Sequence, residues 1–167
     1  MKRSIAFLLV AVPMIAFGAG KSPDQAFFKH AAEGGTAEVD AGTLAQSKGN
    51  SQAVKDFGAM MVKDHTAAND KLKSIATAEN IDLPGKSSVA QLASKAKLEL
   101  LSGDTFDKSY IKGQIKAHEE TVALFKKEIA SGTDAQAKAF ATDTLPTVRE
   151  HLKKIRQIAT EAGVSTK

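Results

Sequence analysis

The chain has 167 residues, with 23 Lys and Arg against 19 Asp and Glu, and it contains neither Cys nor Trp. This length is typical of one domain, and a hydrophobic content of 43% with a charged content of 25% is typical of a globular protein. The lack of cysteine excludes disulfides, thiolate metal sites, cysteine nucleophiles and lipid attachment through cysteine.

The first twenty residues have the pattern of a secretory signal peptide. Two cations precede thirteen uncharged residues, Ile5–Phe17, and the small residues Gly18-Ala19-Gly20 follow. Thirteen residues are fewer than the roughly twenty that span a bilayer as a helix, so a cleaved signal is favoured over an anchor. We therefore expect a signal peptide at 1–20, a single mature domain at 21–167 without a transmembrane segment, and a periplasmic or secreted location.

The charge of the expected mature domain argues against a nucleic-acid partner. Without Lys2 and Arg3 the basic residues number 21 against 19 acids, which leaves a net charge of +2. Cations and acids are interleaved, apart from a small cluster that comprises Arg149, Lys153, Lys154 and Arg156. A nucleic-acid surface needs a concentrated basic stripe with aromatic side chains for stacking. We expect no nucleic-acid partner.

Start and stop signals predict four long helices, at 23–48, 51–79, 104–131 and 134–161. Capping boxes, in which Ser or Thr precedes Gln by three residues, begin at Ser22, Ser88 and Thr133. Glycines in a left-handed conformation are expected to end the segments, at Gly49, Gly103, Gly132 and Gly163. Since no segment alternates like a strand, we predict an all-α fold, a four-helix bundle.

The connection between the second and third long helices, residues 80–103, is longer than a turn. It contains Pro84-Gly85 and then a helical pattern over about 89–101. We therefore predict a short extra helix there. The connection is either a long crossover, as in some four-helix bundles, or a small cap over one end.

Three histidines lie on the apolar stripes that recur every three and four residues along the long helices. His65, His118 and His151 are each within about four residues of the middle of their helices, a spread of roughly 6 Å along the axis. Glu38 is likewise near the middle of the first helix. We therefore expect these four side chains to lie at one level inside the bundle.

A transition-metal site is one interpretation of this level. Bundles hold metal ions with inward side chains of facing helices, and neutral imidazole with carboxylate suits zinc, copper or iron. The candidate ligands are Glu38, His65, His118 and His151. Met61, one turn before His65, and Asp64 are possible accessory ligands, although Asp64 and His65 point about 100° apart and cannot both face the axis.

The chemistry of a di-iron oxidase is disfavoured. Such a centre uses a Glu three residues before a His, and these positions hold Val62, Ile115 and Val148. The absence of a Gly-x-Ser-x-Gly motif removes support for a serine triad. We therefore assign no catalytic residues and do not expect an enzyme.

A hydrogen-bond network is the alternative role for the buried histidines. Each imidazole would bond to a carboxylate or to a polar side chain on the same stripes, namely Tyr110, Gln114, Thr121 or Thr144, and the network would fix the register of the helices. The protein would then be a structural or interaction module of the cell envelope.

The sequence resembles a bacterial family catalogued as domain of unknown function 4142, often labelled predicted outer membrane protein. The resemblance covers Asp24 to about Ala162 and rests on the following residues: Glu38-Val39-Asp40-Ala41-Gly42-Thr43-Leu44-Ala45, Phe57, Met61, Asp64-His65, Phe106-Asp107, Tyr110, His118, Phe140-Ala141, Leu145-Pro146 and His151. It implies a ferritin-like four-helix bundle in a secreted or envelope protein, and no established activity. A likeness to ferritins at the level of the fold does not bring their iron chemistry with it.

Overall fold

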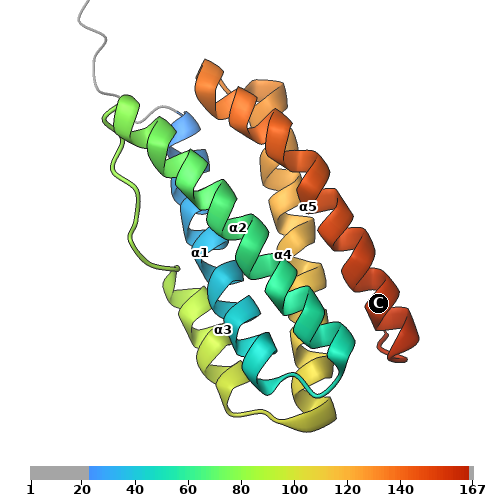
Figure 1. Cartoon of the computed structure of the whole chain (residues 1–167). Helices are drawn as coiled ribbons and strands as arrows, with labels where there is room; N and C mark the ends of the chain where they lie inside the picture. Colours follow the sequence, from blue (N-terminus) through green and yellow to red (C-terminus); the bar gives the residue numbers. More distant parts are fainter. Residues whose placement is uncertain (1–22, 166–167) are drawn as a thin grey trace, which may run out of the picture.

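The computed structural model describes residues 23–165 and confirms the all-α prediction, with four long helices and one short one (Figure 1). The helices are α1 (Pro23–Lys48), α2 (Gln52–Ala78), α3 (Val89–Glu99), α4 (Gly103–Ser131) and α5 (Ala135–Glu161). Among these described residues no helix has the length and apolar character needed to cross a membrane. The predicted signal peptide lies outside the described residues.

The caps of the helices agree only in part with the predicted capping boxes. The box at Ser88 and Gln91 is present at the start of α3. The box predicted at Thr133 is wrong: Asp134 is the N-cap of α5 and accepts a bond from the Ala137 N–H. The Thr133 hydroxyl donates instead to Asp24, because the carboxylate of α1 lies beside this turn. The box predicted at Ser22 is outside the described residues.

Two of the four glycines expected to end segments are left-handed, but Gly103 begins α4 instead of ending the helix before it, and of these two it is Gly163 that follows a helix. Gly103 has a φ of 56° and Gly163 a φ of 62°, whereas Gly132 has a φ of −62° and Gly49 is not among the residues of positive φ. A steric reason accounts for glycine at position 132, since an added Cβ would lie 2.2 Å from the Glu128 carboxylate. At Gly49, just after α1, an added Cβ would lie 2.5 Å from the Ala45 carbonyl oxygen.

The bundle consists of two antiparallel hairpins joined by a long crossover. α1 packs mainly against α2, and α4 mainly against α5. The connection after α2 returns along the outside of the bundle, so that α2 and α4 run in the same direction (Figure 1). α3 lies within this connection and packs against α1 and α4. The connection is therefore the crossover of a ferritin-like bundle, one of the two arrangements that the sequence allows.

The first hairpin is tight because two glycines face each other. A Cβ added to Gly42 of α1 would lie 2.7 Å from the Gly58 carbonyl oxygen of α2, and a Cβ added to Gly58 would lie 2.7 Å from the Gly42 carbonyl oxygen. These distances leave no room for a methyl group between the two backbones. The close approach sets the distance between α1 and α2, the helices that carry Glu38 and His65.

Replacing Gly58 with alanine should therefore destabilise the protein by about 1 to 3 kcal/mol, because the two backbones must separate. The measurement is the free energy of unfolding in urea. Gly113→Ala is the matched control, since an added Cβ at this exposed position in α4 meets no atom within 4 Å. It should stabilise the protein by roughly 0.5 to 1 kcal/mol, the ordinary gain of alanine over glycine in a helix. Equal losses in both variants would contradict the role of the contact.

Buried carboxylates tie the two hairpins together at both ends of the bundle. Asp107 of α4 accepts bonds from the backbone N–H groups of Asn50 and Ser51, in the turn between α1 and α2, at 2.8 Å each. At the opposite end, Asp24 of α1 accepts a bond from the backbone N–H of Thr133 at 2.8 Å. The two hairpins are thus joined at each end by a polar contact.

The carboxyl groups near Asp24 differ in acidity. Burial acts to raise the pKa of Asp24, but its bonds with Thr133 outweigh burial and lower it to about 2. The Glu128 carboxyl is 5% exposed, and burial, followed by a hydrogen bond with Asp24 and by the charges of Asp24 and Asp134, raises its pKa to about 7.

The apolar core is divided into two clusters by a polar layer at mid-height. One cluster surrounds Phe57, Met61 and Tyr110, near the turn between α1 and α2. The other cluster surrounds Phe27 and Phe140, near the turn between α4 and α5. Buried polar side chains occupy the level between the clusters, and they are Glu38, His65, Gln114, His118 and His151. A polar layer across an otherwise apolar interior makes this level the candidate site.

Candidate metal centre

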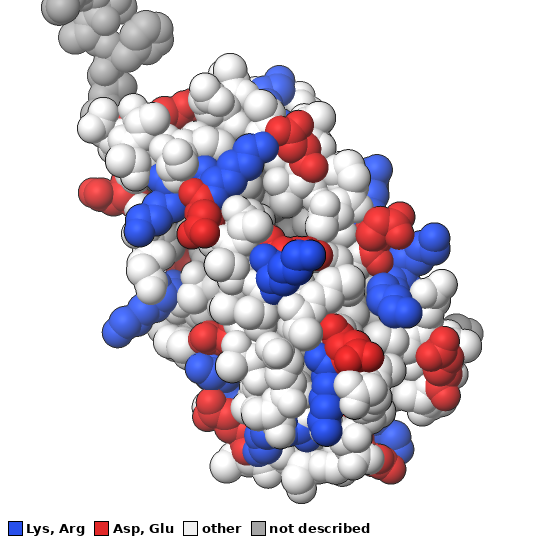
Figure 2. Space-filling view, viewed as in Figure 1, with Lys and Arg blue, Asp and Glu red and all other residues white. Residues whose placement is uncertain are grey.

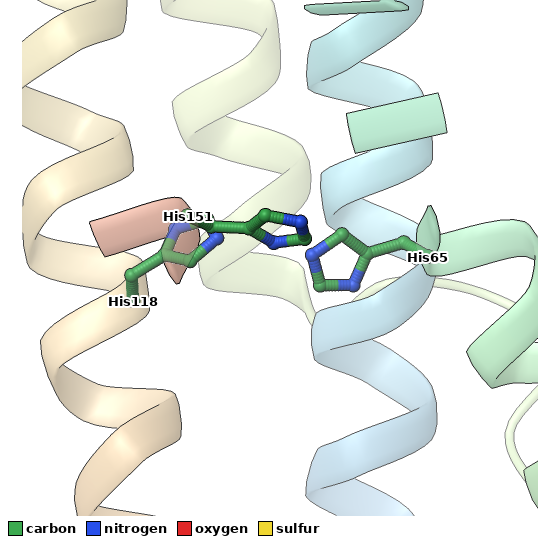
Figure 3. A group of neighbouring side chains, drawn as sticks. All are labelled: His65, His118 and His151. Carbon is green, nitrogen blue, oxygen red and sulfur yellow. The ribbon is translucent and has the colours of Figure 1, made fainter. Parts of the chain in front are cut away.

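Three imidazole rings meet in the middle of the bundle, one each from α2, α4 and α5 (Figure 3). The ring centroids are 5.4 Å apart for His65 and His151, 5.5 Å for His118 and His151, and 5.8 Å for His65 and His118. One nitrogen of each ring lies within 4.8 Å of a nitrogen of both others. The three rings therefore form a cluster at one level, as the positions of the residues in their helices predict. We call it the histidine triad.

A backbone bond fixes the orientation of the His118 ring. Its Nδ1 lies 2.9 Å from the carbonyl oxygen of Gln114, one turn earlier in α4. A carbonyl oxygen can only accept, so Nδ1 carries the proton of the neutral ring and Nε2 keeps a lone pair. The helix itself supplies the acceptor for this bond, since the partner is a main-chain carbonyl four residues before His118.

A bond between helices fixes the His151 ring. Its Nε2 lies 3.0 Å from Oδ2 of Asp64, which reaches across from α2 to α5. The carboxylate accepts, so Nε2 carries the proton and Nδ1 keeps a lone pair. The sequence places Asp64 off the bundle axis, and this direction takes its carboxylate to the neighbouring helix instead of the centre. A carboxylate bonded to the far nitrogen of a histidine is a common arrangement behind metal ligands.

The remaining nitrogens of these rings have no hydrogen-bond partner. Among residues 23–165, eight buried side-chain nitrogen or oxygen atoms lack a partner, and six of them belong to the triad and its polar neighbours. These six are His65 Nε2, His118 Nε2, His151 Nδ1, Glu38 Oε2, Tyr110 Oη and Gln114 Oε1. Buried polar atoms are rarely left without a partner, so their concentration at one level indicates a missing ligand or missing water.

The environment of the triad favours the neutral form of two of its rings, His65 and His151. Burial, reinforced by the neighbouring His118 and His151, lowers the pKa of His65 to about 3. Burial also lowers the pKa of His151, although its bond to Asp64 acts in the opposite direction. A neutral imidazole has the lone pair that a metal ion requires, so burial holds His65 and His151 in the ligating form near neutral pH.

Glu38 lies beside the triad and not inside it. Its Oε1 is 3.9 Å from Nδ1 of His118, the nitrogen that already donates to a backbone carbonyl, and no Glu38 oxygen belongs to the group of ligand atoms within 4.8 Å of one another. Burial raises the pKa of Glu38, while His118 and a bond with Gln114 oppose that shift. Glu38 therefore lies on the Nδ1 side of the His118 ring, where it can help to hold that ring in position.

The predicted accessory residues Asp64 and Met61 have different surroundings. Asp64 contacts His151 as described, and its side chain is 30% exposed. Met61 is fully buried in the apolar cluster and packs against α1 at Gly42. The structure thus brings Asp64 into contact with a triad ring and places Met61 in the core below it.

Phe57 packs against the polar layer from the apolar cluster next to it, a role that the apolar pattern of α2 alone does not reveal. Its ring centroid lies 6.3 Å from those of Tyr110 and His118 and 6.5 Å from that of His151, in edge-to-face arrangements. These contacts restrict the orientations of both imidazoles. The signal in the sequence is the spacing of eight residues between Phe57 and His65, which puts both on one face of α2 about two turns apart.

The family comparison agrees with the resemblance drawn from the sequence. The model of the family described as domain of unknown function 4142 (DUF4142) matches residues 13–158. The chain therefore belongs to the DUF4142 family. No curated protein matches it. Membership of this family carries no assigned activity, so the interpretation of the site depends on its own chemistry.

A solved structure supports the fold of this DUF4142 protein. It is a crystal structure described as "putative secreted protein DUF305" from Streptomyces coelicolor, with a TM-score of 0.74 and 12% sequence identity. The match covers 87% of this chain and 97% of the other. At this identity the likeness establishes a shared helical fold, and it says nothing about a shared site.

Proposed function

We propose that this DUF4142 protein binds one transition-metal ion through His65 Nε2, His118 Nε2 and His151 Nδ1. The observation that carries the proposal is the different use of the two nitrogens in each ring. His118 and His151 each use one nitrogen to hold an outward partner, and in both rings the other nitrogen is buried without a partner. This is the arrangement that orients histidines around a metal ion.

The alternative, a core hydrogen-bond network, accounts for the outward bonds but not for the atoms without partners. A network of that kind stabilises the core when every member is satisfied, and a partly satisfied one costs more than an apolar layer would. Three ring nitrogens of the triad lack partners, and so do Tyr110 Oη and Gln114 Oε1. One ion bound by three lone pairs would satisfy the nitrogens together.

The geometry requires only a small adjustment on binding. Ligand nitrogens stand about 2.0 to 2.1 Å from zinc, so those of a tetrahedral site are roughly 3.4 Å apart. Triad nitrogens within 4.8 Å of one another would have to move together by about an ångström. Three imidazoles suit zinc and copper, and iron is less favoured because no carboxylate oxygen joins the group of close ligand atoms.

Export is the second part of the proposal. The charged start, the uncharged run and the small residues at 18–20 support cleavage of residues 1–20 and a periplasmic or secreted mature protein. The secreted description of the DUF305 structure agrees with this location. Mass spectrometry of the protein recovered from the periplasm should give a mature chain that begins at Lys21; an intact amino terminus in the cytoplasm would contradict export.

The deciding experiment is metal analysis of protein purified without a histidine tag, followed by titration with Zn²⁺. We expect one ion per chain. At a free concentration of 100 times the dissociation constant the ion should stabilise the fold by about 2.7 kcal/mol, which a thermal melt detects as a rise of several degrees. Metal far below one equivalent, with an unchanged melting temperature, would reject the proposal.

A further inference from the structure

The triad is buried, so an ion that binds there must pass between helices. The exposed fractions are 1% for His118, 3% for His151 and 8% for His65. Asp64 is different, because its side chain is 30% exposed and yet its Oδ2 is 3.0 Å from His151. One residue thus connects the solvent with a proposed ligand.

The arrangement of the helices distinguishes two seams between the hairpins. The seam between α1 and α4 is covered by α3, which packs against both helices. The seam between α2 and α5 lies on the other side, toward the viewer in Figure 1, and α2 and α5 contact each other less than the helices within either hairpin do. Asp64 and His151 meet across this second seam.

The face around this seam has no strong charge of one sign. Lysine and arginine side chains alternate with aspartate and glutamate over it (Figure 2). A second ion pair crosses the seam about two turns away, between Lys71 of α2 and Asp143 of α5, with 2.7 Å between the charged atoms. Asp143 is paired with this lysine, whereas Asp64 contacts His151, a ring of the triad. Asp64 is therefore a partly exposed carboxylate at this seam that reaches a proposed ligand directly.

We propose that a hydrated divalent cation enters and leaves the triad between α2 and α5, and that Asp64 is the residue that captures it. This inference rests on the proposed function, and it adds the route of the ion and its chemical class. Carboxylate oxygens bind hydrated divalent ions readily, so the ion contacts Asp64 while it still holds water. The Asp64–His151 bond opens, the ion passes to the imidazole nitrogens, and the bond closes again to hold His151 in its ligating orientation.

The variant Asp64→Asn separates the two roles of Asp64, which are capture of the ion and orientation of the His151 ring. Asparagine has nearly the shape of aspartate and keeps an oxygen that accepts the bond from His151, but it lacks the charge. We expect the association rate constant for Zn²⁺, measured by stopped flow at low ionic strength, to fall about tenfold, since electrostatic attraction accelerates association by that order. The decline of this rate constant with added salt should become shallower, because the attracting charge is gone.

Two further variants control the experiment. Asp143→Asn removes the same charge from the same seam at a carboxylate paired with Lys71, and we expect the association rate constant to stay within twofold of wild type. Asp64→Glu keeps the charge and should restore most of the rate. The inference is overturned if Asp64→Asn changes only the dissociation rate constant, or if both asparagine variants slow association equally. Failure of the wild-type protein to bind Zn²⁺ at all would instead refute the proposed function.

Discussion

Replacing His118 with alanine should lower the affinity for Zn²⁺ at least 100-fold and abolish the rise in melting temperature that the ion causes. Changes behind a metal ligand typically cost 10- to 100-fold in affinity, and the loss of one of three ligands should cost more. Isothermal titration and thermal melts with and without Zn²⁺ measure the two effects. His30→Ala is the matched control, because this side chain is 57% exposed and lies next to Glu33. It should change neither quantity.

The same substitution separates the metal site from a purely structural network. In the absence of metal, His118→Ala removes the bond to the Gln114 carbonyl and the contact with Phe57, so the protein should lose roughly 1 to 3 kcal/mol of stability in either case. If the histidines only form a network, Zn²⁺ will leave the melting temperatures of wild type and variant unchanged. A wild-type protein that is stabilised by Zn²⁺, beside a variant that is not, supports the metal site.

The fold was predictable because each helix carries its own signals. Start and stop signals locate α1, α2, α4 and α5 to within about one residue of their observed bounds, and patterns of three and four residues give their buried faces. The same regularity makes depth predictable: a residue near the middle of each helix has to lie near mid-height, whatever the connections. The convergence of His65, His118 and His151 follows from this rule and from their place on the apolar stripes.

The contacts within the layer were harder to predict, because a helical pattern gives the level and face of a residue but not the atoms it meets. Glu38 has the same depth as the triad, yet its carboxylate lies against the far side of His118. Asp64 points away from the axis of the bundle, and only the position of α5 makes it a partner of His151. The contact between Gly42 and Gly58 likewise requires knowledge of which helices are neighbours.

Lowering the pH should weaken the metal-free protein through His65 and His151. The unfolded value for histidine is 6.5, and burial with the neighbouring imidazoles lowers the pKa of His65 to about 3 in the folded state. Between these values the unfolded chain binds more protons than the folded one, so stability is complete above pH 6.5 and falls as the pH falls. The loss should reach about 3 kcal/mol by pH 4, and His151, whose pKa is also lowered, adds to it.

Glu128 acts in the opposite direction and has to be removed to reveal this effect. Its folded pKa of about 7 lies above the ordinary 4.5, so the folded protein binds more protons between these values and gains stability as the pH falls. In wild-type protein the two contributions partly cancel between pH 6.5 and 4.5. A Glu128→Gln protein should therefore be more stable than wild type at pH 8, where the wild-type carboxyl is charged, and should lose stability more steeply on acidification.

Urea unfolding of the Glu128→Gln protein at pH 7 and pH 5, with a chelator present, measures the contribution of the triad. Adding His65→Gln to this background should flatten the dependence of the unfolding free energy on pH, because the group with the lowered pKa is gone while a side chain of similar size remains. Adding His30→Gln, at an exposed position, should leave the dependence unchanged. Equal slopes in all three proteins would mean that burial does not hold His65 in its neutral form, and this ring would then not keep the lone pair that a metal ion needs.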